Sequence, residues 1–250
     1  KAHLECFGGI DGVIKGKSEL YEYLEQANRK VLINADDSIQ KEKAQNLTYK
    51  SFSLSSTADF NFTDSTDEYV SFTINGTTIK TQLIGHYNLT NVCSAVAFGL
   101  WFGADLQQIK TTCEDYTPNM NRSELVKTEK NSLIMDAYNA NFSSMSAALE
   151  SFEAMKAENK VVILGDMLEL GEQSIERHQE IIEKAKTMNL GKIILCGKGF
   201  GKANQADKTI FHFENSASIS DWLKKEPLKN TTILLKGSRG IALETVLNDL

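Results

Sequence analysis

The segment Lys236-Gly237-Ser238-Arg239-Gly240 brings two cations, a hydroxyl and two glycines together between an expected strand and an expected helix. Backbone N–H groups at the start of a helix, combined with basic side chains, can bind an anion such as a phosphate or a carboxylate. A solvated basic turn explains the same residues without any ligand. The local sequence leaves both interpretations open, and this segment is the first candidate site.

A second glycine-rich segment, Cys196-Gly197-Lys198-Gly199-Phe200-Gly201-Lys202, also follows an apolar run. It matches neither GxGxxG nor GxxxxGK[ST], and no acidic residue follows at the distance that a dinucleotide site requires. We therefore interpret it as a strand-to-helix turn. A dinucleotide oxidoreductase would rest on this segment alone, so we reject that class of function.

The four histidines give weaker evidence of a functional site when each is considered alone. His3 and Lys17 flank a turn rich in glycine at residues 8–12, but a lone histidine near a terminus is usually a surface residue. His178 is expected on a helix, one turn from Ile175 and Ile182, where it would border a hydrophobic core. His86 and His212 have no evident partner in the sequence, and we assign them no role.

Apolar runs in the second half of the chain predict the buried strands that must position these segments. Helical stretches separate the runs, which lie at residues 133–136, 161–165, 192–197 and 231–237. Strands alternating with helices indicate an α/β doubly wound domain. Ligands of such sheets bind beyond the carboxyl ends of the strands, which here means residues 136–141, 165–167 and 236–240.

A helix should follow the first of these strands, capped by Ser143 or Ser144. Its expected apolar face consists of Met145, Ala148, Leu149, Phe152 and Met155.

The first half predicts a mixed α/β region with a different pattern. Asn75-Gly76 is a strong hairpin turn within a stretch of alternating apolar residues at 50–84. The other expected elements are a helix at 18–28, a strand at 31–34, and helices from about 88 to 102 and from about 106 to 113. We place a domain boundary at residue 116, so that residues 1–116 and 117–250 form separate domains.

Composition restricts the class of protein. The apolar share of 41% and the charged share of 24% are those of a soluble globular protein, and no apolar run approaches the roughly 20 residues that span a membrane. A net charge of −6 argues against nucleic-acid binding, which depends on cationic contacts to phosphate. Reduced thiols are expected, because no CxxC pair occurs among Cys6, Cys93, Cys113 and Cys196.

Several segments, taken together, resemble the Mur ligases, the family that builds the peptide of bacterial peptidoglycan. The most specific are Asp136-Ala137-Tyr138-Asn139-Ala140-Asn141 and Leu164-Gly165-Asp166-Met167-Leu168-Glu169-Leu170-Gly171. The others, in the order of the family, are Ala2–Gly8, Lys15–Leu20, Asn34–Asp37, Gly85–Asn91, Asn121-Arg122 and Lys236–Arg239. The resemblance is strongest to the branch that adds D-alanyl-D-alanine to UDP-N-acetylmuramoyl-tripeptide.

The resemblance implies an ATP-dependent amide-bond ligase. ATP converts a substrate carboxylate into an acyl phosphate, an amine attacks it, and phosphate leaves. The implied fold is the C-terminal part of the family's central ATPase domain, followed by a Rossmann-like doubly wound C-terminal domain. We expect a cytoplasmic bacterial protein that acts as a monomer, with no membrane or nucleic-acid partner.

The resemblance also implies roles at the nucleotide and its metal. Lys17 matches the lysine that the family carries as a carbamate, and His3 matches a histidine that binds the same Mg²⁺. Carbamate formation needs a neutral amine, so burial or a nearby cation should lower the pKa of Lys17. Asn91 and Asn88 match positions that read the adenine edge. Arg122 matches a residue that contacts the phosphates of ATP, and Asp136 matches one that contacts the ribose. The implied catalytic residues are Lys17, His3 and Arg122.

A further group is expected to line the second domain's side of the cleft and to hold the incoming dipeptide. Lys236 or Arg239 would take the carboxylate of the dipeptide. The whole group comprises Asn139, Asn141, Asp166, Glu169, Lys236, Ser238 and Arg239.

Two departures from the family pattern are local: Tyr87 stands where the family often has His, and Phe142 where it often has Pro. A larger one concerns the Gly-rich Lys-Thr/Ser phosphate loop and the domain that grips the UDP sugar, which we expect before Lys1. On that interpretation the 250 residues are an N-terminally truncated piece, inactive by itself. Two alternatives remain: a sister ligase that adds a single amino acid, and a non-catalytic nucleotide-binding α/β module.

Overall fold

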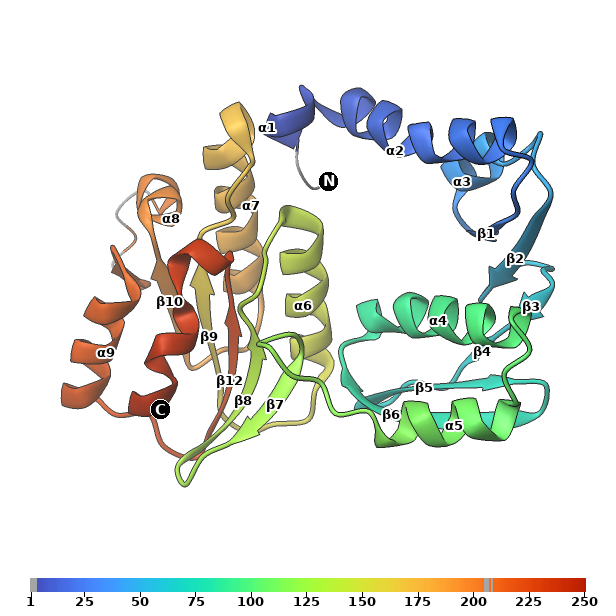
Figure 1. Ribbon diagram of the computed structural model, residues 1–250. Helices are drawn as coiled ribbons and strands as arrows, with labels where there is room; N and C mark the ends of the chain where they lie inside the picture. The colour runs from blue at the N-terminus through green and yellow to red at the C-terminus, as the bar shows by residue number, and fades with distance from the viewer. Residues whose placement is uncertain (1–3, 205–206, 208) are drawn as a thin grey trace. The chain divides into compact units, whose positions relative to one another are not determined.

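The structure, a computed structural model, describes residues 4–204, 207 and 209–250 (Figure 1). The chain divides into two compact units, one formed by residues 7–117 and the other by residues 118–250 with the described residues 4–6. Each unit contains its own hydrophobic core, and each is described by itself. Among the described residues, no helix has both the length and the apolar character that a bilayer crossing requires.

Two small sheets and their helices make up the first half of the chain. Its elements are α1 (Leu4–Phe7), α2 (Ile10–Gln26), β1 (Val31–Asn34), α3 (Ser38–Lys43), β2 (Tyr49–Ser53), β3 (Phe60–Asn61), β4 (Thr63–Asp64), β5 (Tyr69–Ile74), β6 (Thr77–Ile84), η1 (His86–Asn88), α4 (Leu89–Trp101) and α5 (Leu106–Asp115). β1, β2 and β3 pair in parallel, whereas β4, β5 and β6 pair antiparallel. The predicted hairpin turn is confirmed, because Asn75 and Gly76 join β5 to β6 with φ of 48° and 74°.

Aromatic side chains organise the core of this unit. The buried Phe72 ring meets Phe62 edge-on at 5.6 Å between centroids, and Phe62 meets Phe52 in the same way at 6.3 Å. Such edge-to-face pairs add to the free energy gained from burying the rings. The helix α4 closes the core with Leu89, Cys93, Val96 and Ala97.

The start of α2 differs from the expectation. The helix begins at Ile10 rather than at residue 18, so Gly12 lies inside it and not in a turn. A Cβ on Gly12 would meet the Phe7 carbonyl oxygen at 1.7 Å, and one on Gly16 would meet the Phe7 ring at 2.6 Å. These glycines let the preceding residue approach the helix closely, which glycine content alone does not reveal.

One mixed sheet organises the C-terminal unit. Its elements are β7 (Glu124–Lys127), β8 (Asn131–Asp136), α6 (Phe142–Ala154), β9 (Lys160–Gly165), η2 (Gly171–Gln173), α7 (Ser174–Thr187), β10 (Lys192–Cys196), α8 (Lys198–Ala203), β11 (Phe211–Phe213), α9 (Ser216–Lys225), β12 (Thr231–Lys236), η3 (Arg239–Ile241) and η4 (Leu243–Asp249). The strand order is β11-β10-β9-β12-β8-β7, and all pairs are parallel except β7 with β8.

Helices cover both faces of this sheet. Figure 1 shows α6 and α7 on one side and α9 with η4 on the other. Alternate strand residues such as Leu133, Ile163 and Leu235 join the core beneath α9 and η4, and pleating turns their neighbours to the opposite face. The strands therefore read as continuous apolar runs, which is why they could be predicted.

The chain leaves the neighbouring strands β9 and β12 toward opposite faces. The α7 helix follows β9 on the side of α6, whereas η4 follows β12 on the side of α9 (Figure 1). Gly165 and Gly237 sit side by side there, and a Cβ on Gly237 would lie 2.9 Å from the Gly165 Cα. Such a switch point is where open α/β sheets bind ligands.

The predicted α/β class and the four predicted strands of this unit are confirmed, as β8, β9, β10 and β12. The expected helix cap is wrong, because Asn141 and not Ser143 or Ser144 caps α6. The Asn141 side chain accepts from Ser144 N, and Ser144 Oγ accepts from Asn141 N in return. The short strands β7 and β11 were not predicted.

A matched pair of substitutions should separate core from surface in the unit of residues 7–117. Phe72→Ala removes a fully buried ring and should cost about 3–5 kcal/mol. Phe102→Ala, at a side chain with 81% exposure, should change stability by less than about 0.5 kcal/mol. Urea unfolding followed by Trp101 fluorescence in a Trp222→Phe background reports this unit alone. Equal changes in the free energy of unfolding for the two variants would contradict the core described above.

Candidate functional site

A buried ion pair joins the carboxyl ends of two neighbouring strands. Asp136 and Lys236 are register partners at the ends of β8 and β12, and the Lys236 Nζ lies 2.5 Å from the Asp136 Oδ2. The lysine also donates to the Asn139 carbonyl at 3.4 Å, and Asp136 Oδ1 accepts from Ser123 N at 3.3 Å. Lys236 is only 2% exposed, so its charge must be neutralised inside the protein. The ammonium is therefore directed at Asp136 and not at solvent.

Beside this pair, two guanidinium groups share one aromatic ring. The Arg122 Cζ lies 3.6 Å from the centroid of the Tyr138 ring, and the Arg239 Cζ lies 5.5 Å from it. A hydrogen bond from Arg122, followed by the charges of both arginines, lowers the pKa of the Tyr138 hydroxyl. Both arginines are exposed. Stacking on an aromatic face fixes the planar guanidinium while its N–H groups remain able to bind an anion.

A small cavity of about 160 Å³ adjoins this stack. It is lined by Met120, Asn121, Ala137, Tyr138, Arg239 and Glu244. Met120, Asn121 and Ser123 adopt positive φ angles of 60°, 58° and 50°. Left-handed residues so close together cost free energy and occur where the surrounding structure requires them, which is common at ligand sites.

Ser238 ties together the ends of three strands. Its backbone N–H donates to the Asp166 carbonyl at 3.0 Å, and its hydroxyl accepts from Leu168 N at 3.0 Å and donates to the Ala140 carbonyl at 3.3 Å. Ser238 is 4% exposed. Its hydroxyl therefore holds the strand ends in position.

The carboxylate of Asp166 caps a helix. It accepts from Gly199 N at 2.7 Å and from Phe200 N at 2.8 Å, at the start of α8. A Cβ on Gly197, whose φ is 114°, would lie 2.4 Å from the Asp166 Cγ. The predicted strand-to-helix turn is thus confirmed, and its glycines make room for this internal carboxylate.

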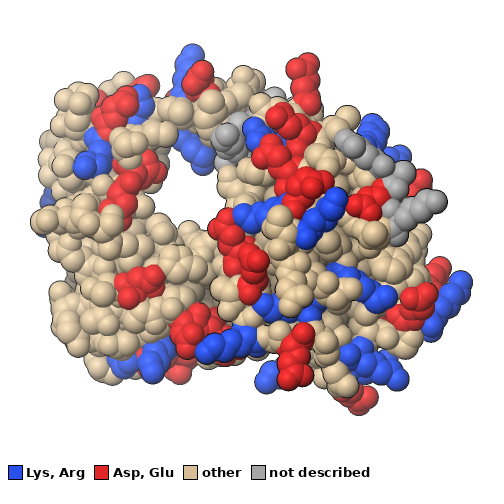
Figure 2. All heavy atoms as spheres, turned by 180° about the vertical axis from the view of Figure 1, so that it is seen from behind, with Lys and Arg blue, Asp and Glu red and all other residues tan. Residues whose placement is uncertain are grey.

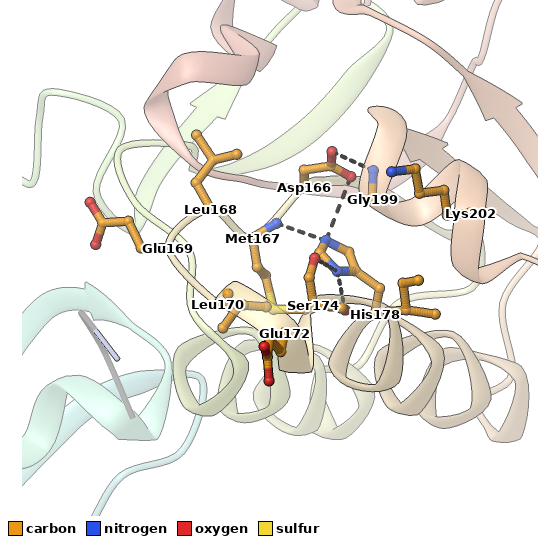
Figure 3. Close-up of a pocket in the computed structure, with 12 residues that line it drawn as sticks. Asp166, Met167, Leu168, Glu169, Leu170, Glu172, Ser174, His178, Gly199 and Lys202 are labelled. Atoms are coloured by element: carbon orange, nitrogen blue, oxygen red, sulfur yellow. Dashed lines mark hydrogen bonds and ion pairs between the residues drawn. The ribbon is translucent and has the colours of Figure 1, made fainter. Parts of the chain in front are cut away.

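A larger pocket of about 510 Å³ lies beside Asp166 (Figure 3). The loop after β9 forms one wall, α7 contributes Ser174, Ile175 and His178, and α8 contributes Gly199 and Lys202. Glu169 stands on that loop with a positive φ of 64° and its side chain is exposed.

Acidic and basic side chains are intermixed over the face of this unit seen in Figure 2.

The remaining expected site residues are spread over both units. Asn139 is exposed, whereas the Asn141 side chain is engaged in capping α6. In the unit of residues 7–117, Asn91 is exposed on α4, and Asn88 Nδ2 donates to the Ile84 carbonyl at 2.8 Å.

The expected metal ligands are Lys17 and His3. Lys17 is exposed on α2, and His3 lies outside the described residues. Across residues 4–204, 207 and 209–250, no group of three or more His, Cys, Asp or Glu side chains is arranged to hold a metal ion.

Sequence reasoning missed two contributors to this face of the sheet. Tyr138 was part of a recognised motif but received no role, although an aromatic residue close to a strand end suits stacking by arginine. His178 was assigned to the edge of the core, yet it is completely buried and contacts the loop after β9. Nothing in the local sequence reports that contact, because it joins a helix to a loop in three dimensions.

Comparison with known proteins identifies two adjoining domains. Residues 1–99 match the Mur ligase middle domain, and residues 121–239 match the domain described as Mur ligase, glutamate ligase domain. The UDP-N-acetylmuramoyl-tripeptide--D-alanyl-D-alanine ligase of Buchnera aphidicola subsp. Acyrthosiphon pisum is 33% identical over the whole chain, which covers 57% of that relative. The ligase of the same name from Escherichia coli is 30% identical over the whole chain, which covers 58% of it.

Solved structures agree with this result. The crystal structure of MurF from Acinetobacter baumannii superposes on the whole chain with a TM-score of 0.84 at 25% identity, and the chain covers 57% of it. MurF from Thermotoga maritima, solved in complex with ADP, shares the fold with a TM-score of 0.83 at 20% identity over 99% of this chain and 58% of its own. The chain therefore spans little more than half the length of the relatives that it matches.

The Asp136–Lys236 pair can be tested by breaking it. Lys236→Met leaves a buried carboxylate without its cation and should destabilise the C-terminal unit by about 3–5 kcal/mol. Adding Asp136→Asn should restore part of that loss, because the orphaned charge is removed. Urea unfolding followed by Trp222 fluorescence in a Trp101→Phe background measures the free energy of unfolding of the single and the double variant.

The control for this prediction is Lys224→Met, the same substitution at an exposed lysine that lies 3.4 Å from Asp221. An exposed pair contributes less than about 1 kcal/mol. A shift as small for Lys236→Met as for Lys224→Met would show that the buried pair does not support the strand ends.

Proposed function

This chain belongs to the Mur ligase family, and we propose that it forms part of an ATP-dependent ligase that adds D-alanyl-D-alanine to UDP-N-acetylmuramoyl-tripeptide. The observation that carries the proposal is that ligases bearing this name match the chain over its whole length. The DAYNAN and LGDMLELG segments, which carry the resemblance to this branch, lie at the strand ends beside the switch point of the C-terminal sheet. The proposed setting is peptidoglycan precursor synthesis in the bacterial cytoplasm.

In the proposed reaction, ATP transfers its terminal phosphoryl group to the carboxylate of the tripeptide and ADP leaves. The amine of the dipeptide attacks the activated carbonyl carbon, a proton is lost from the nitrogen, and inorganic phosphate departs. The protein has to orient these groups and to stabilise the charge on the phosphoryl oxygens. Arg122 suits the second task, because its guanidinium is already stacked on Tyr138 at 3.6 Å and is exposed.

We further propose that Asn88 and Asn91 contact adenine and that Asp136 contacts the ribose. The exposed amide of Asn91 supports the first assignment, since an amide can both donate to and accept from a base edge. Asp136 is held rigidly by Lys236, which would pre-organise its carboxylate.

The dipeptide carboxylate needs a cation, and the two candidates differ in availability. Lys236 is buried against Asp136, whereas Arg239 is exposed at the edge of the switch point. We therefore propose Arg239 for the dipeptide carboxylate. Asn139 and Glu169 are exposed and could contact the dipeptide directly. Asp166, Ser238 and Asn141 would act by holding the loops that surround it, because their side chains bind backbone groups.

Magnesium would supply charge neutralisation at the phosphates of ATP. An ammonium has no lone pair for a metal, so Lys17 fits this role only after its amine has combined with CO₂ to give a carbamate oxygen donor. Lys17 is exposed on α2, so the expected burial of its amine is not found in the unit of residues 7–117, although exposure leaves the amine accessible to CO₂. His3 is the second proposed ligand.

The proposed reaction can be tested with the full-length protein, ATP, magnesium and UDP-N-acetylmuramoyl-tripeptide. We expect phosphate release and a product extended by one dipeptide with D-alanyl-D-alanine, and neither with single amino acids. Activity with single amino acids only would favour a sister ligase. No turnover with any amine would favour a non-catalytic nucleotide-binding module. The 250 residues contain no GxxxxGK[ST] loop, and we propose that they do not turn over ATP by themselves.

Lys17→Arg in the full-length protein tests the carbamate. Arginine keeps the positive charge but cannot form the carbamate, so kcat should fall by at least about 100-fold, the scale of losing an electrostatic contact to the transition state. Lys15→Arg is the control, because Lys15 is another exposed lysine on α2. An unchanged kcat in Lys17→Arg would remove Lys17 from the proposed metal site.

A further inference from the structure

The loop after β9 is held by two backbone hydrogen bonds to side chains from other elements. Met167 N donates to His178 Nε2 at 3.0 Å, and Leu168 N donates to Ser238 Oγ at 3.0 Å. Met167 and Leu168 both line the 510 Å³ pocket, and Figure 3 shows the His178 ring facing the Met167 N–H. The second bond leads directly to Arg239, the next residue after Ser238. A displacement of this loop would therefore reach the proposed dipeptide site.

The hydrogen bonds of His178 define its protonation state. Its Nδ1 lies 2.7 Å from the Ser174 carbonyl oxygen, which can only accept, so Nδ1 carries a proton. Its Nε2 receives the Met167 N–H, so Nε2 carries none. The ring is thus neutral, with its proton on Nδ1. The two hydrogen bonds select this tautomer, because the Ser174 carbonyl can only accept and the Met167 N–H can only donate.

Burial favours the same form. His178 is completely buried, and its ring packs edge-on against Phe200 with 4.5 Å between centroids. Burial lowers the pKa of His178, and it outweighs the opposing effects of the hydrogen bond to Ser174 and of the Asp166 charge. The neutral ring therefore stabilises the fold fully above the ordinary histidine pKa of about 6.5, and this contribution is lost as the pH falls through the lower pKa of the folded state.

Protonation would exchange the partners of Nε2. The Asp166 Oδ1 lies 3.5 Å from Nε2, and a new Nε2–H would be attracted to it while repelling the Met167 N–H. The other charged groups that line this pocket are Glu169 and Glu172 on the β9–α7 connection and Lys202 on α8. Met167, which is 2% exposed, would then have a buried N–H without its acceptor.

We propose that His178 is a positioning residue for the amine-bearing substrate: its neutral ring holds Met167, and through Leu168 and Ser238 it keeps the dipeptide site in its binding-competent form. This inference rests on the proposed function. It assigns a pH-sensitive device to a residue that touches neither ATP nor the reacting atoms. As the pH falls, binding of D-alanyl-D-alanine should weaken before the fold is lost.

Two substitutions separate the two hydrogen bonds of the ring. In His178→Gln the amide oxygen can reach the position of Nε2 and accept from Met167 N, and it has no titratable proton. In His178→Asn the shorter amide lies near the position of Nδ1, so it can donate to the Ser174 carbonyl but cannot reach Met167. The glutamine variant is therefore the expected rescue.

The first measurement is amide hydrogen exchange of Met167 in the 250-residue chain, which needs no enzyme activity. Exchange should be about tenfold faster in His178→Asn, the factor for losing roughly one hydrogen bond, and close to wild type in His178→Gln. Lowering the pH should accelerate exchange at Met167, relative to the intrinsic rate, in wild type but not in His178→Gln. Unchanged exchange in His178→Asn would overturn the anchoring role.

The second measurement is the KM of the full-length protein for D-alanyl-D-alanine against pH. The substrate amine also protonates, but it does so equally for all variants, so the ratio of variant to wild type isolates His178. We expect the wild-type KM to rise relative to His178→Gln as the pH falls through the lowered pKa of His178 in the folded state, and the KM of His178→Asn to be raised about tenfold at all pH values, with the KM for ATP unchanged.

The outcomes distinguish this inference from the proposed function. If wild type shows no dipeptide-dependent phosphate release, the proposed function fails and this inference with it. If wild type ligates the dipeptide but the pH profiles of KM for wild type and His178→Gln coincide, only the positioning role is overturned. That comparison does not depend on the asparagine variant being folded.

Discussion

The buried carboxylate of Asp166 is the constraint on which the C-terminal unit depends. A charge at the end of a central strand, 7% exposed, must be satisfied by donors, and the first N–H groups of α8 supply them at 2.7 and 2.8 Å. That requirement forces glycine at Gly197, where a side chain would occupy the place of the carboxylate. It also ties the end of β9 to the start of α8, the helix that follows β10.

The site that grows around this point consists of a rigid layer and an exposed layer. Asp136, Lys236 and Ser238 are buried and bind one another's elements, so they hold the strand ends at fixed positions. Arg122 and Arg239 are exposed and converge on Tyr138. The two layers differ because of burial. A buried charge must be neutralised by a partner within the protein and so holds neighbouring groups in place, whereas an exposed guanidinium still has N–H donors available for a ligand. Under the proposed function, most of the residues expected to hold the dipeptide would support the loops around it, and Arg239 would take its carboxylate.

The parts of the fold that could be predicted are those whose signal is local. The strands β8, β9, β10 and β12 are buried on both faces and therefore appear as apolar runs. The strands β7 and β11 lie at the two edges of the sheet and are only half-buried, so their sequences carry no such run. The cap of α6 was wrong because Asn141 and two serines are all good capping residues, and only the backbone path into the helix selects one of them.

The sequence by itself determined the family and the set of residues available for chemistry, because those follow from residue type, order and spacing. Tertiary structure decided what each of them does. Lys236 pairs with Asp136 only because β8 and β12 are adjacent and in register, a relation that no spacing along the chain expresses. His178 has a defined proton only because Met167 and Ser174 face its two nitrogens. The physical reason is the same in both cases: burial and partner identity set the state of a charged or titratable group, and both are properties of the folded chain.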